Sequence, residues 1–304
     1  MLNFKLSLRR RRQLWAYAFI FIPLLFFITI RIAPTFYAFN VSLHEWNPLS
    51  AERPFVGLDN FRKIAQEMQE RDSVTRKAFQ NTFIYVILGV PTQLTIGLFT
   101  AMMLNRINKL RGLFRGLYVI PFVTSTVAIS WVWRWLYLPT FGPLNLLLDA
   151  FGLPEQPFLQ SPKQALPCIA AVTVWQGLGY VVIIFLAGLQ QIPEEYYDAA
   201  KVDGASGWQL FRHITIPLLN PTIVYLAVLQ SIRFLRMFAQ VMNMTEQARG
   251  GPLNSTITVV LQLYKAAFRS FKMGYASALT VILFVIIMLI TLIQLRVLTR
   301  KFEY

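Results

Sequence analysis

Charged side chains are scarce in this sequence. Only 14% of its 304 residues are Asp, Glu, Lys or Arg, whereas a soluble domain carries about a quarter. The single cysteine, Cys168, excludes an internal disulfide, and two histidines leave little for a metal site. We therefore expect no metal site, and we predict that Cys168 is a small buried apolar residue.

The sequence also lacks the pattern G-x-x-x-x-G-K-[ST], so the chain cannot hydrolyse ATP through a P-loop of its own. We expect neither catalytic residues nor a cofactor bound by this chain. The net charge is +15, but the basic residues flank apolar stretches instead of forming one solvated face. This distribution favours anionic lipid headgroups over nucleic acid as the partner.

Long apolar runs, in contrast, are abundant. Hydrophobic residues make up 56% of the chain, and runs of about 20 residues, the length that crosses a bilayer, recur throughout. The first run follows a stretch of four arginines, but it exceeds signal-peptide length and has no cleavage site, so we expect it to be retained. The sequence predicts an all-α membrane protein with six transmembrane helices, at Leu14–Phe39, Thr82–Leu104, Leu117–Leu138, Pro167–Leu189, Leu218–Val241 and Tyr275–Leu298.

Basic residues near the span ends predict the orientation. With the N-terminus in the cytoplasm, the inner segments hold fourteen Lys or Arg and five Asp or Glu, against eleven and nine in the outer segments. Both termini are therefore expected to be cytoplasmic. Four of the five inner acidic residues lie in one segment, residues 190–217.

This polar segment predicts two short helices. Pro193 stands where the first residue of a helix belongs, and two acidic residues follow it, where the helix dipole favours them. Gly204 permits a turn that a residue with a β-carbon would resist. Ser206 and Gln209 form the pattern of a capping box that opens the second helix. An acidic patch on a basic face favours a docking surface for a cytoplasmic partner over an ordinary surface hairpin.

The same segment resembles the cytoplasmic "EAA" loop of ABC-importer permeases, whose pattern is E-A-A, three residues, G, nine residues, then I-x-L-P. The chain has the same spacing, with Asp198-Ala199-Ala200, then Gly204, then Ile214-Thr215-Ile216-Pro217. Asp198 stands where the pattern has Glu, and Ile216 where it has Leu. The resemblance assigns coupling to a partner ATPase to Glu195, Asp198, Ala199, Ala200, Gly204, Ile214 and Pro217.

Other stretches resemble one branch of this family, the sugar-importer permeases of the maltose and glycerol-phosphate type, and most closely the first permease of the usual pair. They are FVGLDNF (Phe55–Phe61), LFRGLYVIP (Leu113–Pro121), LAGLQQIPEE (Leu186–Glu195) and MGYASAL (Met273–Leu279). After Phe238 the chain departs from the branch, because MNMTEQARGGP is longer than the usual turn and adds Glu246 and Arg249. The outer face is expected to differ locally there.

The resemblance implies the ABC type I importer permease fold and a permease subunit of an ATP-driven, binding-protein-dependent importer for a sugar or a related polyol or glycoside. It places the chain in a bacterial or archaeal plasma membrane. The implied partners are two ATP-binding cassette subunits that use ATP and Mg, a second permease that is a different chain, an external solute-binding protein and the lipid bilayer. The helices would alternate between inward- and outward-facing states.

The expected organisation has four parts: a basic N-terminus with the first span (residues 1–40), an external loop (41–81), a five-helix permease core with the cytoplasmic loop 190–217 (82–298), and a cytoplasmic tail (299–304). The alternative is a self-contained secondary transporter of small polar solutes. That class predicts carboxylates inside the spans or an inverted repeat. No Asp or Glu lies in the six predicted spans, and no repeat is evident.

Polar and aromatic side chains inside the spans form a candidate substrate path: Gln93, Trp133, Gln176, Tyr180, Gln230, Arg233 and Arg236. An arginine at the membrane centre costs about 2.5–3.5 kcal/mol, so each arginine contacts solute, snorkels to the outer interface or belongs to a structural pair. Trp133 either stacks on sugar rings or belongs to an interfacial belt. The glutamines and the tyrosine either line a cavity or bridge helices. Residues Thr256–Phe271 are expected to form an amphipathic helix at the outer face.

Overall fold

A computed structural model describes residues 8–50, 52–106, 111–246 and 250–298. The described residues are helical throughout, apart from connecting loops and one isolated antiparallel bridge between His44 and Phe55. The predicted tail 299–304 and the first seven residues lie outside this part. The chain divides into two compact units, residues 1–64 with 266–282 and residues 65–265 with 283–304.

The first unit begins with a helix of 35 residues, made of α1 (Leu8–Phe27), a π-turn (Ile28–Ile32) and α2 (Ala33–Ser42). Pro34 has no N–H to donate to Ile30, and the ladder shifts there to a bond from the Ala33 N–H to the Ile28 carbonyl. The following loop is fixed by Asn60 on α3 (Asp59–Gln69), whose amide donates to the carbonyls of Ser42 at 2.9 Å and His44 at 3.1 Å.

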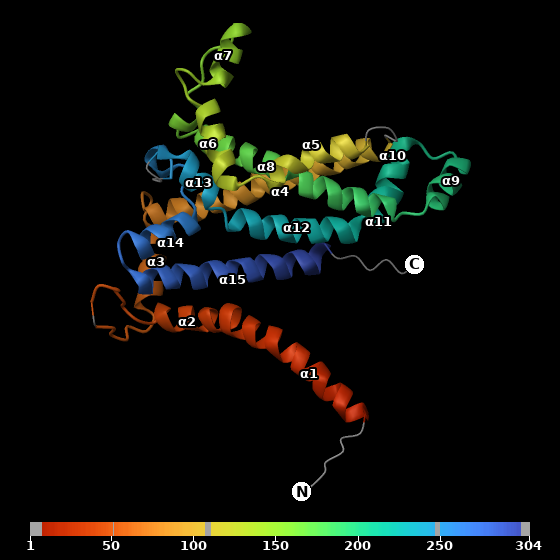
Figure 1. Cartoon of the computed structure of the whole chain (residues 1–304). Helices are drawn as coiled ribbons and strands as arrows, with labels where there is room; N and C mark the ends of the chain where they lie inside the picture. Colours follow the sequence, from red (N-terminus) through yellow and green to blue (C-terminus); the bar gives the residue numbers. More distant parts are fainter. Residues whose placement is uncertain (1–7, 51, 107–110, 247–249, 299–304) are drawn as a thin grey trace. The chain divides into compact units, whose positions relative to one another are not determined.

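Three helices form the centre of the second unit: α4 (Val74–Arg106), α8 (Ala165–Gln190) and α12 (Asn220–Leu235) (Figure 1). Each of these helices packs against the other two, and α5 (Arg111–Val123) lies along α8. Glycines allow the close approach: a β-carbon on Gly97 of α4 would lie 2.5 Å from the Val181 side chain of α8. The last helix of the described residues is α15 (Met273–Leu298).

The remaining elements are short. They are α6 (Thr126–Leu136), α7 (Pro143–Ala150), the 3₁₀ turn η2 (Phe158–Gln160), α9 (Glu194–Val202), α10 (Gly207–Leu210), the π-turn η3 (Phe211–Thr215), α11 (Ile216–Leu218), α13 (Ala239–Met244), the 3₁₀ turn η5 (Pro252–Asn254) and α14 (Val259–Phe268).

Within the described residues, four helical segments are long and apolar enough to span a membrane, and up to six if each bent pair counts as one span. The first, second, fourth and sixth predicted spans fall on these four segments: Leu8–Ser42, α4, α8 and α15. The all-helical fold is therefore confirmed, whereas the count of six spans and the orientation of the termini stay predictions.

The third predicted span is wrong as a continuous helix. Its two parts, Gly116–Val123 and Thr126–Leu136, are bent by 101°. The break falls at Thr124 and Ser125: the Thr124 hydroxyl donates back to the Ile120 carbonyl at 2.7 Å, and Ser125 adopts an extended conformation with ψ of 127°. Short hydroxyl side chains that bond to the local backbone favour such helix ends.

The fifth predicted span also needs correction, because α12 ends at Leu235 and the chain resumes as α13 at Ala239. The Met237 carbonyl in the break accepts a hydrogen bond of 2.8 Å from the Thr258 hydroxyl. At the other end, α12 is bent by 66° from Gly207–Leu218. Pro221 has no N–H to donate to Pro217, so the helical ladder is interrupted there.

Two smaller expectations change as well. The predicted outer helix Thr256–Phe271 is helical over Val259–Phe268, and Leu261 on it is fully buried. Cys168 is only half-buried near the start of α8, not buried as predicted.

Candidate functional site

The polar segment between α8 and α12, residues 190–217, is called here the coupling loop. It contains the two predicted short helices, α9 and α10. Pro193 has φ of −60° and ψ of 136° and caps α9, which begins one residue later than predicted, at Glu194. In Figure 1, α9 lies at the far end of the second unit, beyond the end of α8.

The turn after α9 depends on Gly204, which has φ of +81°. The Gly204 N–H donates to the Lys201 carbonyl at 3.0 Å, and the Ala205 N–H donates to the Ala200 carbonyl at 2.9 Å. These two bonds form a Schellman motif, in which the residue with positive φ is usually glycine because it has no β-carbon. The predicted turn at Gly204 is therefore confirmed.

The capping box is also confirmed. The Ser206 N–H donates to Gln209 Oε1 at 2.6 Å, and the Gln209 N–H donates to Ser206 Oγ at 3.4 Å. Two backbone donors at the start of α10 are thus satisfied within the segment itself. The two ends of the turn are fixed by local bonds, so the sequence determines its shape.

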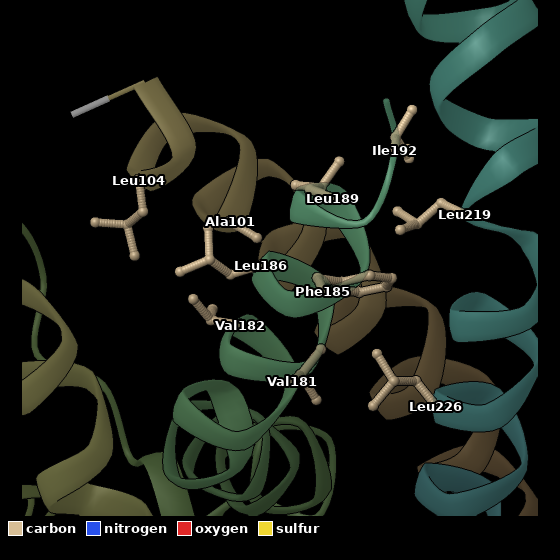
Figure 2. Packing of buried hydrophobic residues seen from close by; sticks show 10 residues of the cluster. All are labelled: Ala101, Leu104, Val181, Val182, Phe185, Leu186, Leu189, Ile192, Leu219 and Leu226. Carbon is tan, nitrogen blue, oxygen red and sulfur yellow. The ribbon is translucent and has the colours of Figure 1, made fainter. Parts of the chain in front are cut away.

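The coupling loop is joined to the helix bundle at its base. The Tyr197 hydroxyl of α9 lies 3.0 Å from Thr215 Oγ1, which ties the first half of the loop to the second. Tyr197 also packs against the apolar cluster of Figure 2, which consists of Ala101, Leu104, Val181, Val182, Phe185, Leu186, Leu189, Ile192, Leu219 and Leu226. The cluster combines the ends of α4 and α8 with residues on both sides of the loop. The base of the loop is therefore close-packed with the ends of these helices.

The residues assigned to coupling lie on different surfaces of this loop. Glu195, Asp198, Ala199 and Gly204 are exposed, whereas Ala200, Ile214 and Pro217 are half-buried. Asp198 is held by an exposed ion pair with Lys201 at 2.9 Å. The exposed set is thus available to a partner, and the half-buried set faces the rest of the chain.

Three apolar side chains on the loop were not predicted as functional. Val202 is 88% exposed, Trp208 66% and Tyr196 46%. Large apolar residues exposed together on the most polar loop are typical of an interaction surface. The sequence signal was available, since these residues interrupt an otherwise polar stretch.

The second candidate site lies inside the bundle, where Gln93 of α4, Gly177 of α8 and Arg233 of α12 come together. A β-carbon on Gly177 would overlap both the Gln93 side-chain nitrogen and the Arg233 guanidinium. Gln93 is fully buried, and its side-chain nitrogen donates to the Val174 carbonyl at 3.4 Å, while its Oε1 has no hydrogen-bond partner among the described residues. Of the predicted path, the structure therefore brings Gln93 and Arg233 together.

Gln176 bridges helices, one of the two roles considered. Its side-chain nitrogen donates to Thr126 Oγ1 of α6 at 3.0 Å, and its Oε1 accepts from Gln240 of α13 at 3.3 Å. Gln230 is also buried, and its Oε1 has no hydrogen-bond partner within the part of the chain that the structure describes.

The two aromatic residues of the predicted path, Tyr180 and Trp133, belong to separate aromatic groups. Tyr180 stacks on Phe122, with ring centroids 5.3 Å apart, and its hydroxyl lies 3.0 Å from that of Tyr225. Trp133 is half-buried and contacts Trp175 at 5.3 Å and Tyr137 at 5.5 Å between ring centroids. Its neighbours Trp131 and Trp135 are each 55% exposed, which is typical of an interfacial belt.

Arg236 is separated from the Arg233 cluster, since it is exposed at the C-terminal end of α12. Among the described residues, no group of three or more His, Cys, Asp or Glu could hold a metal ion.

Known proteins provide a comparison for this arrangement. The family model described as "Binding-protein-dependent transport system inner membrane component" matches residues 82–304. The trehalose/maltose transport system permease protein MalF of Thermococcus litoralis is 30% identical over 97% of this chain and 97% of its own length. The lactose transport system permease protein LacF of Rhizobium radiobacter is 38% identical over 73% of this chain and 74% of its own.

Among solved structures, a chain of a bacterial alginate ABC transporter, crystallised with an alginate pentasaccharide-bound periplasmic protein, has a TM-score of 0.81. It is 21% identical and covers 94% of this chain and 94% of its own. At this identity the likeness shows the fold.

Proposed function

We propose, from the premise that this chain belongs to the family of binding-protein-dependent transport system inner membrane components, that it is the permease subunit of an ATP-driven saccharide importer. The family places it in a prokaryotic plasma membrane as a multi-pass translocation component. Saccharide is proposed as the cargo because relatives along most of the chain are named for trehalose, maltose and lactose transport.

The geometry of the coupling loop is the observation that supports this function most. Acidic and apolar side chains are exposed on α9 and α10, while the base of the loop is packed into the apolar cluster. In the proposed mechanism this loop lies in a cleft of a cytoplasmic ATPase. Asp198 supplies charge, Ala199 permits close contact, and Gly204 keeps the turn compact.

The ATPase uses ATP and Mg, and its closure displaces the coupling loop. Because Ile192 at the start of the loop and Leu219 just after it belong to the same buried cluster as Phe185 of α8, the displacement moves the ends of α4, α8 and α12 together. The bundle then alternates between inward- and outward-facing states. The N- and C-termini and the coupling loop lie in the cytoplasm in this proposal.

The proposed complex holds two ATPase subunits, this chain, a second permease of different sequence and an external solute-binding protein. Residues 82–298 form the permease core within it, with residues 1–40 and 41–81 as first span and external loop. The alternative, a secondary transporter, is disfavoured because ion coupling commonly uses carboxylates inside the membrane. None lies in α4, α5, α6, α8, α12 or α15.

Gentle extraction of the tagged chain from its native membrane, followed by identification of the bound proteins, tests the proposal. We expect stoichiometric recovery of an ATP-binding cassette subunit and a second permease. A matched Asp198→Lys variant should retain the second permease and lose most of the ATPase, because it reverses the charge on the exposed face of α9. A chain that is recovered alone and moves solute alone after reconstitution would be a secondary transporter.

A further inference from the structure

The Arg233 guanidinium lies in the interior of the bundle, not at its outer rim. Gly177, which it contacts, is twelve residues after the start of α8 and thirteen before its end. At 1.5 Å per residue, the guanidinium therefore lies about 20 Å from either end of that helix. Gln93 and Arg233 are likewise each thirteen residues from the ends of α4 and α12 nearest the coupling loop.

This position rules out the snorkelling considered for Arg233, because a guanidinium that reached the outer interface would not lie beside the middle of α8. Arg236 differs, since it is exposed where α12 ends. The two arginines are one turn apart on the same helix and yet lie in different environments. Arg236 therefore provides a matched control for Arg233.

No acidic side chain balances Arg233 within the described part of the chain. The helices around it contain no Asp or Glu, and the ion pairs Asp59–Arg62 and Asp198–Lys201 lie elsewhere. Its polar neighbour Gln93 is neutral. A cation in the membrane interior is stabilised by an anion or by several acceptor groups, and the helices around Arg233 supply no carboxylate as the anion.

From this geometry we infer that the transported solute is an acidic saccharide whose carboxylate binds Arg233 at the centre of the bundle. The inference rests on the proposed function and narrows its substrate class from saccharides to uronate-containing saccharides. A carboxylate matches the planar fork of the guanidinium with two parallel hydrogen bonds. The partnerless oxygens Gln93 Oε1 and Gln230 Oε1 are acceptors for sugar hydroxyls once the bundle opens. Arg233 is then a specificity-determining residue.

The test uses the purified permease–ATPase complex without its solute-binding protein, so that the selectivity of that protein does not affect the measured binding. The melting temperature is measured against concentration for two acidic probes, digalacturonate and diglucuronate, and for the neutral galactose and glucose disaccharides of the same linkage. We expect at least one acidic probe to reach half-saturation at a concentration tenfold or more below that of its neutral counterpart. Arg233→Gln should abolish this preference, and Arg236→Gln should leave it intact.

Gly177→Ala adds a positional test, because its methyl group would displace the guanidinium without removing its charge. This variant should weaken binding of the acidic probe while the binding of the neutral probe changes less. Recovery of both partner subunits with each variant is measured before any probe is added, which separates failure of this inference from failure of the proposed function. Equal binding of acidic and neutral probes, binding of neither, or an acidic preference that survives Arg233→Gln would overturn the inference. If the Arg233→Gln complex lost the second permease, the anion that pairs with Arg233 would belong to that subunit. This outcome would also overturn the inference.

Discussion

Replacement of Gly204 by valine is expected to abolish ATP-driven uptake while the inserted amount of the chain stays unchanged. The residue has φ of +81° at the turn between α9 and α10, a conformation that β-branched side chains resist. Forcing it costs about 1–3 kcal/mol, and relief of that strain requires the turn to reopen. Since no atom lies within 4 Å of a β-carbon placed at Gly204, the effect comes from the backbone and not from a clash.

Gly207 provides the matched control. It lies three residues further on in the same loop, has no positive φ, and a β-carbon placed there also meets nothing within 4 Å. Gly207→Ala should therefore transport at close to the wild-type rate. Uptake of labelled solute into proteoliposomes, normalised to the amount of assembled complex, measures both variants. Substantial uptake by Gly204→Val would show that the shape of the turn is not needed for coupling.

The second large effect is expected for Gly179→Ala, which should destabilise the packing of α5 on α8. A β-carbon there would overlap the Tyr118 carbonyl oxygen and lie 2.7 Å from its carbon and 3.1 Å from Val119 Cα. These are backbone atoms, so no side-chain rotation relieves the overlap and the helices must separate. Overpacking of this kind costs about 1–3 kcal/mol. That corresponds to a melting temperature lower by roughly 2–5 °C for the solubilised chain of 304 residues.

Gly116→Ala is the control for this change, because Gly116 lies on α5 and a β-carbon there meets nothing within 4 Å. Alanine favours the helix over glycine by about 1 kcal/mol, so this variant should melt at or slightly above the wild-type temperature. A Gly179→Ala chain that melts with the wild type would mean that α5 does not pack on α8 as described.

The coupling loop was predictable from sequence because its structure is local. The Schellman turn at Gly204 and the capping box at Ser206 each depend on residues within five positions of one another. The helices α4, α8 and α15 were predictable for a similar reason, since each is a long unbroken apolar run. In each of these cases the determining residues lie close together along the chain.

The breaks in the third and fifth predicted spans could not be predicted in this way. The hydrogen bond that holds the Met237 carbonyl comes from Thr258, which is twenty-one residues further on and lies outside the predicted span. Likewise, whether Arg233 snorkels or faces inward depends on Gly177 and Gln93 from two other helices. Hydropathy measures how apolar a stretch is, but it does not identify the distant residues that contact or hydrogen-bond to its polar groups.

Site-specific cross-linking of the coupling loop tests the central claim most directly. Cys168 is replaced by serine, and a single cysteine is introduced at Val202 on α9, which is 88% exposed, or at Phe151 after α7, which is 75% exposed and precedes the opposite end of α8. In native membranes we expect Val202→Cys to cross-link to an ATP-binding cassette subunit, with a yield that changes when ATP is added, and Phe151→Cys to give no such product. Absence of the ATPase from the Val202→Cys products, or its appearance with Phe151→Cys, would contradict the account.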